Sequence, residues 1–414
     1  MLPIEASKLL IVEGVEGDPC MRARVERLRP GIFADDVRRV GDAELAAVVK
    51  ADLAAAPHNG MKADFRPVVI LNRFRFDDGE AERRRRAEAF PDLNRLKFNG
   101  YGGFDWRDSG SPAWRQGTGL VCQPAWQLHT IVGCHFRCAY CHLSWVLNVM
   151  MNMEDFVERL DGWMDQCPLQ TLFQYDNWTD TVCFEPEHGG SKLLIDYFAR
   201  KPGRALELYV GKSDHVDWML GYDHRGHTVC CWSVSAATQS RLFEYRSAPM
   251  EARIEAMRKC QQAGYPVRVR FSPIVPVRNW EAENREMIRR LFSRVRPDVV
   301  TIETIRFLTY EAMASCFDPS LLDEEFVAAM KAFSGQPFAP GCEVPDDWRK
   351  RVYRFFFDEL AAAGCEAPVA FCREKRDLWD HFAPDFARYG QHPDAYICNC
   401  GPYSAPATAA MLDD

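Results

Sequence analysis

The feature that most restricts the fold is a regular alternation of short apolar runs and helix-like stretches after Gln127. Six runs of strand length follow one another, and stretches with helical apolar spacing, such as Met153–Cys167 and Met250–Ala263, separate several of them. This alternation predicts βα units and a parallel sheet. Six units of this size form a curved, partly closed barrel, smaller than a complete eight-unit barrel. The predicted strands are Leu128–Val132, Thr171–Tyr175, Leu206–Val210, Val229–Val234, Val267–Ile274 and Val299–Ile305.

The chain of 414 residues is long enough for two or three structural units. We expect an α/β protein whose partial (βα)6 TIM-like barrel over residues 121–310 lies between an N-terminal α/β extension and a C-terminal extension. The first extension covers residues 1–120, and the second covers residues 311–414 and ends in a tail that contains cysteines. Outside the barrel we predict helices over Asp35–Leu53 and Trp348–Ala362, and strands over Arg66–Phe74 and Pro368–Cys372.

Composition excludes some classes of protein. The sequence has no apolar run of about 18 residues, so a membrane-spanning helix is not expected. Its first residues lack the pattern of a secretory signal, which predicts a cytoplasmic protein. Acidic residues outnumber basic ones by 59 to 51, and this balance disfavours broad binding to nucleic acid. The run Arg83–Arg86 is interpreted as a solvated helix face, with a phosphate-tracking patch as the alternative.

The motif that indicates chemistry is a triad of cysteines after the first predicted strand. Cys134, Cys138 and Cys141 have the spacing C-x3-C-x2-C, and Tyr140 precedes the last cysteine. Three thiolates on one loop can hold three irons of a [4Fe–4S] cluster and leave the fourth iron open. A zinc site is the alternative, but zinc usually takes a fourth ligand at close, paired spacing, and none follows within the next 25 residues.

With this triad the chain resembles the radical S-adenosylmethionine superfamily. The block Phe243–Pro249, together with Ser272-Pro273-Ile274 and the upstream Cys122-Gln123-Pro124, is similar to the spore photoproduct lyase branch. The similarity extends from about residue 120 to residue 307. It implies a reduced [4Fe–4S] cluster that donates an electron to S-adenosylmethionine and releases a 5′-deoxyadenosyl radical.

The resemblance also implies roles for individual residues. Cys134, Cys138 and Cys141 would ligate iron, and Lys212 would pair with the carboxylate of S-adenosylmethionine. Ser233 and Ser235 fall where the family has Ser and Asn near the nucleoside, and Arg246 would complete the polar wall beside Ser235. Tyr140, of the triad loop, is included among the residues expected to bind the cofactor.

One position departs from the family. Photoproduct lyases have a cysteine after the second strand that returns a hydrogen atom to the repaired thymine, and here Asn177 occupies that position. Tyr175, Asp176, Asn177 and Thr179 form a polar and aromatic stretch that could hold the methionyl amino group or a substrate. The loss of the hydrogen donor argues against a DNA-repair lyase.

A second group of thiols lies near the C-terminus. Cys398 and Cys400 form a C-x-C pair, with Cys372 upstream. Such a pair can chelate a soft metal or metalloid, or present a thiol to a substrate radical. The alternative is a tail with incidental cysteines. If the tail covers the barrel mouth, Cys398 or Cys400 could replace the missing hydrogen donor.

These observations predict a radical S-adenosylmethionine enzyme that acts on a small, biosynthetic molecule. Its electron donor would be an external protein such as flavodoxin or ferredoxin. One alternative is repair of a DNA lesion. Another is transfer of the 3-amino-3-carboxypropyl group of S-adenosylmethionine to a soft acceptor held by Cys398 and Cys400. A metal-binding module without catalysis is a third class.

Overall fold

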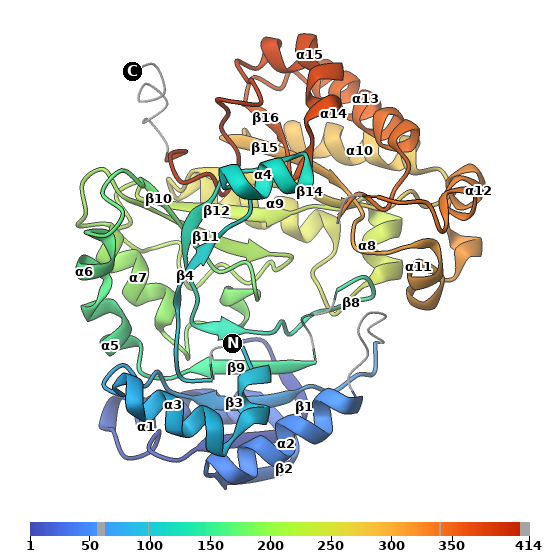
Figure 1. Ribbon diagram of the computed structural model, residues 1–414. Coiled ribbons are helices and arrows are strands. Elements are labelled where there is room, and N and C mark those ends of the chain that lie inside the picture. Colours follow the sequence, from blue (N-terminus) through green and yellow to red (C-terminus); the bar gives the residue numbers. More distant parts are fainter. Residues whose placement is uncertain (56–62, 98, 142, 144, 339–340, 406–414) are drawn as a thin grey trace.

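The computed structural model describes residues 1–414 except 56–62, 98, 142, 144, 339–340 and 406–414. Two main sheets organise the described chain (Figure 1). A five-stranded sheet and its helices form the lower part of the view, and an eight-stranded sheet with helices on its outer face forms the upper part. Among the described residues, none of the helices combines the length and apolar character that a membrane crossing requires.

The five-stranded sheet is built mostly from the N-terminal region, in the order β2-β1-β3-β9-β7. Its first four strands are parallel, and β7 pairs antiparallel with β9. Its strands are β1 (Ile4–Val12), β2 (Ile32–Val40), β3 (Val68–Asn72), β7 (Ile131–Val132) and β9 (Val146–Met150). The helices beside them are α1 (Pro19–Leu28), α2 (Asp42–Ala55) and α3 (Glu80–Ala89).

The eight-stranded sheet confirms the predicted partial barrel. Its order is β16-β15-β14-β12-β11-β10-β6-β4, and the seven strands from β16 to β6 run parallel, while β4 pairs antiparallel with β6. The strands are β4 (Phe104–Arg107), β6 (Ala125–Leu128), β10 (Leu172–Tyr175), β11 (Ala205–Gly211), β12 (Thr228–Ser233), β14 (Val267–Ile274), β15 (Val299–Thr304) and β16 (Val369–Phe371).

Helices connect the strands of the barrel and cover its outer face. Helix α9 shows why they form: its buried residues Met250, Ile254 and Met257 recur every three or four positions and face the sheet. The connecting helices are α5 (Met153–Glu158), α6 (Leu160–Met164), α7 (Gly190–Phe198), α8 (Ala237–Phe243), α9 (Met250–Gln262) and α10 (Trp280–Phe292). After β15 come α11 (Tyr310–Cys316), α12 (Glu324–Phe333) and α13 (Asp346–Ala362). Near the C-terminus lie α14 (Arg376–His381) and α15 (Ala383–Arg388).

The segment between residues 120 and 150 belongs to both sheets. β6 joins the barrel, but the chain then crosses to the N-terminal sheet as β7 and returns to that sheet as β9. The cysteine loop is the connection between β7 and β9. Within it, β8 (Arg137–Cys138) pairs with β13 (Glu244–Tyr245), which follows the barrel helix α8. The loop is therefore anchored to both sheets.

Two predicted elements differ from the structure. The first predicted barrel strand, Leu128–Val132, is divided: Leu128 ends β6 of the barrel, whereas Ile131–Val132 form β7 of the N-terminal sheet. Asp35–Val40, the first part of the helix expected over Asp35–Leu53, belongs to strand β2, and α2 begins only at Asp42. Parallel pairing with β1 determines the conformation here, although the acidic residues of this stretch have no strong strand preference. The other elements predicted outside the barrel coincide with β3, α13 and β16.

Candidate active site

The three cysteines of the loop line one cavity of about 230 Å³ between the loop and the barrel. Its other walls come from the carboxyl ends of the barrel strands, where catalytic groups of such folds lie. A larger cavity, of about 460 Å³, lies beside Trp106 and Leu169 and contains none of the three cysteines. The polar residues that line the smaller cavity include Asn177, Thr179, Asp180, Tyr209, Lys212, Ser272, Glu303 and Arg306.

Local backbone geometry positions the cysteine loop. Gly133 has a φ of +101°, and a Cβ at this residue would lie 1.6 Å from the carbonyl oxygen of Val146. The loop can therefore leave β7 beside β9 only with glycine at this position. The amide of Ala139 donates to the carbonyl of Phe243 at 2.7 Å, which fixes the second half of the loop against α8.

Burial raises the pKa of the Cys138 thiol to about 12, although nearby Lys212 opposes the shift. Burial also raises the pKa of Cys134. Both are thiols at neutral pH, so a metal group that binds here as thiolates must displace protons. Among the described residues, no three His, Cys, Asp or Glu side chains converge on a single ion. An iron–sulfur cubane does not require this, because each cysteine binds a different iron. The cysteine triad can therefore hold a cluster although its three sulfurs do not converge on one point.

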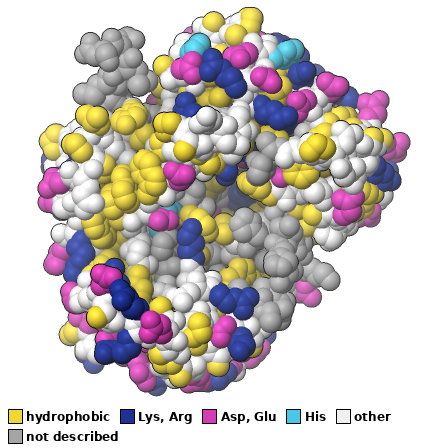
Figure 2. All heavy atoms as spheres, viewed as in Figure 1, with side chains coloured by type: hydrophobic (Ala, Val, Ile, Leu, Met, Phe, Trp, Pro, Cys, Tyr) yellow, Lys and Arg dark blue, Asp and Glu magenta, His cyan; other side chains and the backbone are white. Residues whose placement is uncertain are grey.

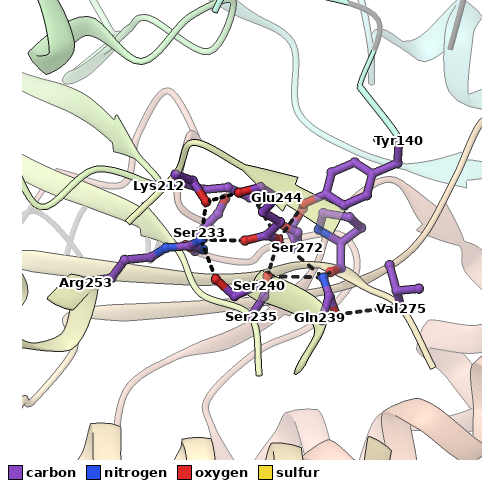
Figure 3. A network of polar contacts seen from close by, with 12 residues as sticks. Tyr140, Lys212, Ser233, Ser235, Gln239, Ser240, Glu244, Arg253, Ser272 and Val275 are labelled. Carbon is purple, nitrogen blue, oxygen red and sulfur yellow. Dashed lines mark hydrogen bonds and ion pairs between the residues drawn. The ribbon is translucent and has the colours of Figure 1, made fainter. Parts of the chain in front are cut away.

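A buried carboxylate, Glu244, organises the polar wall beside the loop (Figure 3). It accepts from the hydroxyl of Tyr140 at 2.6 Å, the hydroxyl of Ser235 at 2.6 Å and the guanidinium of Arg253 at 2.5 Å. Lys212 Nζ lies 4.0 Å from the same carboxylate. Burial alone would raise the pKa of Glu244, but Arg253 and Lys212 outweigh it and lower the pKa to about 2. The site thus holds a permanent negative charge beside a buried lysine.

The end of strand β10 presents several polar atoms without partners in the described structure. Asn177 Oδ1, Thr179 Oγ1 and Asp180 Oδ1 are buried and make no hydrogen bond, and all three residues line the cavity. The other oxygen of Asp180 accepts from the amide of Lys212 at 3.0 Å. Burial raises the pKa of Asp180 well above its usual value, although the amide of Lys212 and the charge of Arg253 oppose this shift. Buried polar groups normally have partners, so this wall is suited to a polar ligand.

Other residues named from the sequence lie away from the cavity lining. Tyr175 bonds Thr130 at 2.8 Å, and Asp176 lies 2.6 Å from His129, so both support the strand end from behind. Ser233 bonds the hydroxyl of Tyr209 at 3.0 Å. Arg246 does not stand beside Ser235. It forms an ion pair with Glu5 of β1, because a positive φ of 65° turns the chain toward the N-terminal sheet.

The C-terminal thiols are not at the mouth of the barrel. Cys398 and Cys400 line a separate small cavity with Cys122 and Cys372. Glu244 and Arg253 were not among the site residues predicted from the sequence, although both stand in or beside the block Phe243–Pro249. The available signal was Arg253, a charged residue among the apolar residues Met250, Ile254 and Met257 of the buried face of α9.

The run Arg83–Arg86 forms ion pairs rather than a free positive surface. Arg84 pairs with Glu80, Arg85 with Glu82, and Arg86 with Asp42. Figure 2 shows Lys and Arg side chains beside Asp and Glu side chains on this lower part of the surface. The interpretation as a solvated helix face is the one that agrees with these contacts.

The stretch that contains the cysteine loop and the barrel is similar to one known family. A family model described as spore photoproduct lyase matches residues 124–316. The chain is 29% identical over 184 residues to the spore photoproduct lyase of Bacillus subtilis, which covers 42% of this chain and 54% of the relative. It is 24% identical over 200 residues to that of Clostridium acetobutylicum, covering 46% and 59%. The chain thus spans about half the length of the curated relatives it matches.

Solved structures show the same fold over a longer stretch. A spore photoproduct lyase complexed with dinucleoside spore photoproduct superposes with a TM-score of 0.60, covering 89% of this chain and all of the other at 17% identity. A variant of that enzyme with bound AdoMet and the same dinucleoside also gives 0.60, at 16% identity. At this level of identity the likeness shows the fold.

Proposed function

Because the chain resembles the spore photoproduct lyase branch of the radical S-adenosylmethionine superfamily, we propose that it cleaves S-adenosylmethionine reductively and starts radical chemistry. The observation that carries the proposal is the arrangement of the cysteine loop. Three thiols with the family spacing line one cavity, and this cavity also contains Lys212, beside Glu244, and the unpartnered atoms of Asn177 and Thr179.

The residues present fit a [4Fe–4S] cluster and S-adenosylmethionine. Cys134, Cys138 and Cys141 would hold the cluster, which supplies the electron for reductive cleavage when it is bound and reduced. Lys212 would attract the methionyl carboxylate, and Asn177 and Thr179 would accept from the methionyl amino group. Tyr140 is held against Glu244 and closes the wall between the loop and the barrel.

For the substrate, the comparisons favour a damaged nucleobase over a small biosynthetic molecule. The relatives are named for a photoproduct, and solved neighbours contain a dinucleoside. Phe307 lines the cavity and is 50% exposed, so it offers a face on which a base could stack. A lesion in duplex DNA would have to be turned out of the helix to reach the cavity.

Two observations favour a small molecule as a second candidate. Asn177 stands where the family has its hydrogen-donating cysteine, and amides do not donate hydrogen atoms as thiols do. Three of the four arginines of α3, Arg84, Arg85 and Arg86, are paired with carboxylates, so they provide no free patch for a phosphate backbone. Both candidates use the same cavity and differ in what enters it.

The test is incubation of the iron-reconstituted, reduced protein with S-adenosylmethionine and dinucleoside spore photoproduct without oxygen. The proposal predicts 5′-deoxyadenosine and a product dependent on the dinucleoside, both absent in Cys138→Ala. Cleavage that is unaffected by the dinucleoside would favour the small-molecule candidate. Release of methylthioadenosine would instead indicate 3-amino-3-carboxypropyl transfer.

A further inference from the structure

Four cysteines from three distant segments surround one small cavity at the other end of the barrel interior. Cys122 follows β5 (Leu120–Val121), Cys372 follows β16, and Cys398 and Cys400 belong to the C-terminal tail. The cavity has a volume of about 20 Å³. This is enough for one water-sized particle and far too little for an iron–sulfur cubane.

The tail that contributes two of these thiols is built into the protein. Arg268 of β14 donates to the carbonyl of Asn399 at 2.8 Å, and the Asn399 side chain donates to the carbonyl of Val269 at 3.1 Å. The amide of Leu172, at the start of β10, donates to the carbonyl of Pro402 at 3.0 Å. Figure 1 shows this segment beside α4 (Pro112–Thr118) and the barrel strands. These hydrogen bonds hold the segment against β14 and the start of β10.

Two arginines stand against the thiols. Arg107 Nη1 lies 3.1 Å from Cys400 Sγ, and Arg270 Nη2 lies 3.8 Å from Cys372 Sγ. Arg107 pairs with no carboxylate among the described residues; its other contacts are the carbonyls of Gln123 and Cys400. The Nε atoms of both arginines are buried and have no hydrogen-bond partner in the described structure. A buried guanidinium in this state calls for negative charge nearby.

We propose that Cys122, Cys372, Cys398 and Cys400 bind one soft divalent cation, such as Zn²⁺, as thiolates. Four sulfur ligands in tetrahedral array are a common structural zinc set. Four thiolates around a divalent ion leave two negative charges. Arg107 offsets one of them, and Arg270, which also pairs with Glu303 at 3.5 Å, lies beside Cys372. Each thiol gives up its proton to solvent when the ion binds.

The thiols must turn toward the cavity centre to bind, since no three of them converge on one point in the described structure. Each cysteine has one side-chain torsion, and a change of rotamer moves only the sulfur. The site would tie the tail to β16 and to the segment before β6. It would also lie beneath the candidate active site, because Arg270 is placed between Cys372 and Glu303, a residue of the active-site cavity.

The experiment measures zinc and iron per chain by mass spectrometry after anaerobic purification and cluster reconstitution. Cobalt substitution then provides a thiolate-to-metal charge-transfer band. We expect about one zinc per chain in the wild-type protein. Cys400→Ser should weaken zinc affinity by more than the roughly tenfold typical of losing an outer hydrogen-bond partner. Cys20→Ser, at an exposed cysteine of α1, is the matched control and should change nothing.

One further variant and one further measurement keep the outcome clear. A variant with alanine at Cys134, Cys138 and Cys141 should lose its iron and retain its zinc, so failure of the proposed function would not affect this result. Retained iron in Cys400→Ser would show that the variant folds. The inference is overturned by zinc-free wild-type protein after zinc exposure, by a second set of irons lost in Cys400→Ser, or by a Cys398–Cys400 disulfide in the anaerobic protein.

Discussion

Glu244 is the residue on which the polar wall of the candidate active site depends. Its side chain is fully buried, and so is that of Arg253, which pairs with it. Removal of one partner from such a pair leaves an uncompensated buried charge. Tyr140 and Ser235 would lose the same acceptor. The wall is therefore stabilised by charge more than by apolar packing.

We predict that Glu244→Gln lowers the free energy of unfolding by about 3–5 kcal/mol. Chemical denaturation of the iron-free protein measures this free energy. Glu251→Gln is the control, because Glu251 pairs with Arg290 and Arg294 at a partly exposed position and should cost at most about 1 kcal/mol. If both variants lost a similar, small amount of unfolding free energy, the polar wall would not depend on the charge of Glu244.

Substitution of Thr179 tests whether the polar residues that follow β10 bind S-adenosylmethionine. Its hydroxyl is buried without a partner and lines the cavity. Thr179→Val keeps the shape and removes the hydroxyl, so we predict an unchanged or slightly higher stability. Binding of S-adenosylmethionine to the reconstituted protein should weaken by about 1 kcal/mol, or severalfold. Equilibrium dialysis measures this, and unchanged affinity would exclude the hydroxyl from the binding site.

At the scale of the element, Glu185 fixes the beginning of α7. Its carboxylate accepts from the amides of Gly189 and Ser191, both at 2.8 Å, and lies 3.8 Å from His188. Burial alone would raise its pKa, but His188 and the donors at Ser191 outweigh burial and lower the pKa below 4.5. A depressed pKa means that this stabilisation is complete above 4.5 and is lost as the pH falls through the folded-state pKa.

Glu185→Gln should therefore lower stability at neutral pH by about 1–3 kcal/mol and make its acid dependence shallower below pH 4.5. The unfolding midpoint in denaturant, measured across the acid range, gives both effects. Glu187→Gln, two residues away, is the comparison, because it removes a partly exposed ion pair with the N-terminal amine and leaves Glu185 in place. A wild-type and a Glu185→Gln curve that stay parallel through the acid range would refute the prediction.

The sequence predicts elements well where local pattern and packing agree. The barrel strands β10, β11, β12, β14 and β15 lie within a residue or two of their predicted positions. Both the local pattern and the packing favour a buried strand for an apolar run between amphipathic helices. Asp35–Val40 was wrongly assigned to a helix because its pairing with β1 is a tertiary effect. The same holds for β7 and β9, which no local pattern assigns to the N-terminal sheet.

The site residues also differ in whether local sequence or tertiary contact determines their surroundings. The spacing of Cys134, Cys138 and Cys141 is local and is visible in the sequence, and the structure places all three on one cavity. The partner of Arg246, Glu5, is 241 residues away, and the four thiols around the C-terminal cavity come from three segments. Contacts of this kind depend on topology, so the sequence alone could suggest the residues but not their neighbours.

At the scale of the whole molecule, the N-terminal sheet supports the cysteine loop. The apolar core of that sheet includes Ile131, Leu147 and Val149 from the strands on either side of the loop, all nearly fully buried. We predict that deletion of residues 1–100 exposes β9 and prevents the loop from holding iron. Iron per chain after reconstitution measures this. A soluble truncated protein with a full cluster would show that the barrel alone positions the loop.

The central claim is that this cavity cleaves S-adenosylmethionine with an electron from a cluster held by the three loop cysteines. The most direct measurement is the nucleoside released by the reduced, reconstituted protein without oxygen. The account predicts 5′-deoxyadenosine from the wild-type protein and none from Cys138→Ala. An intact cluster that releases no 5′-deoxyadenosine, with or without dinucleoside spore photoproduct, would contradict it.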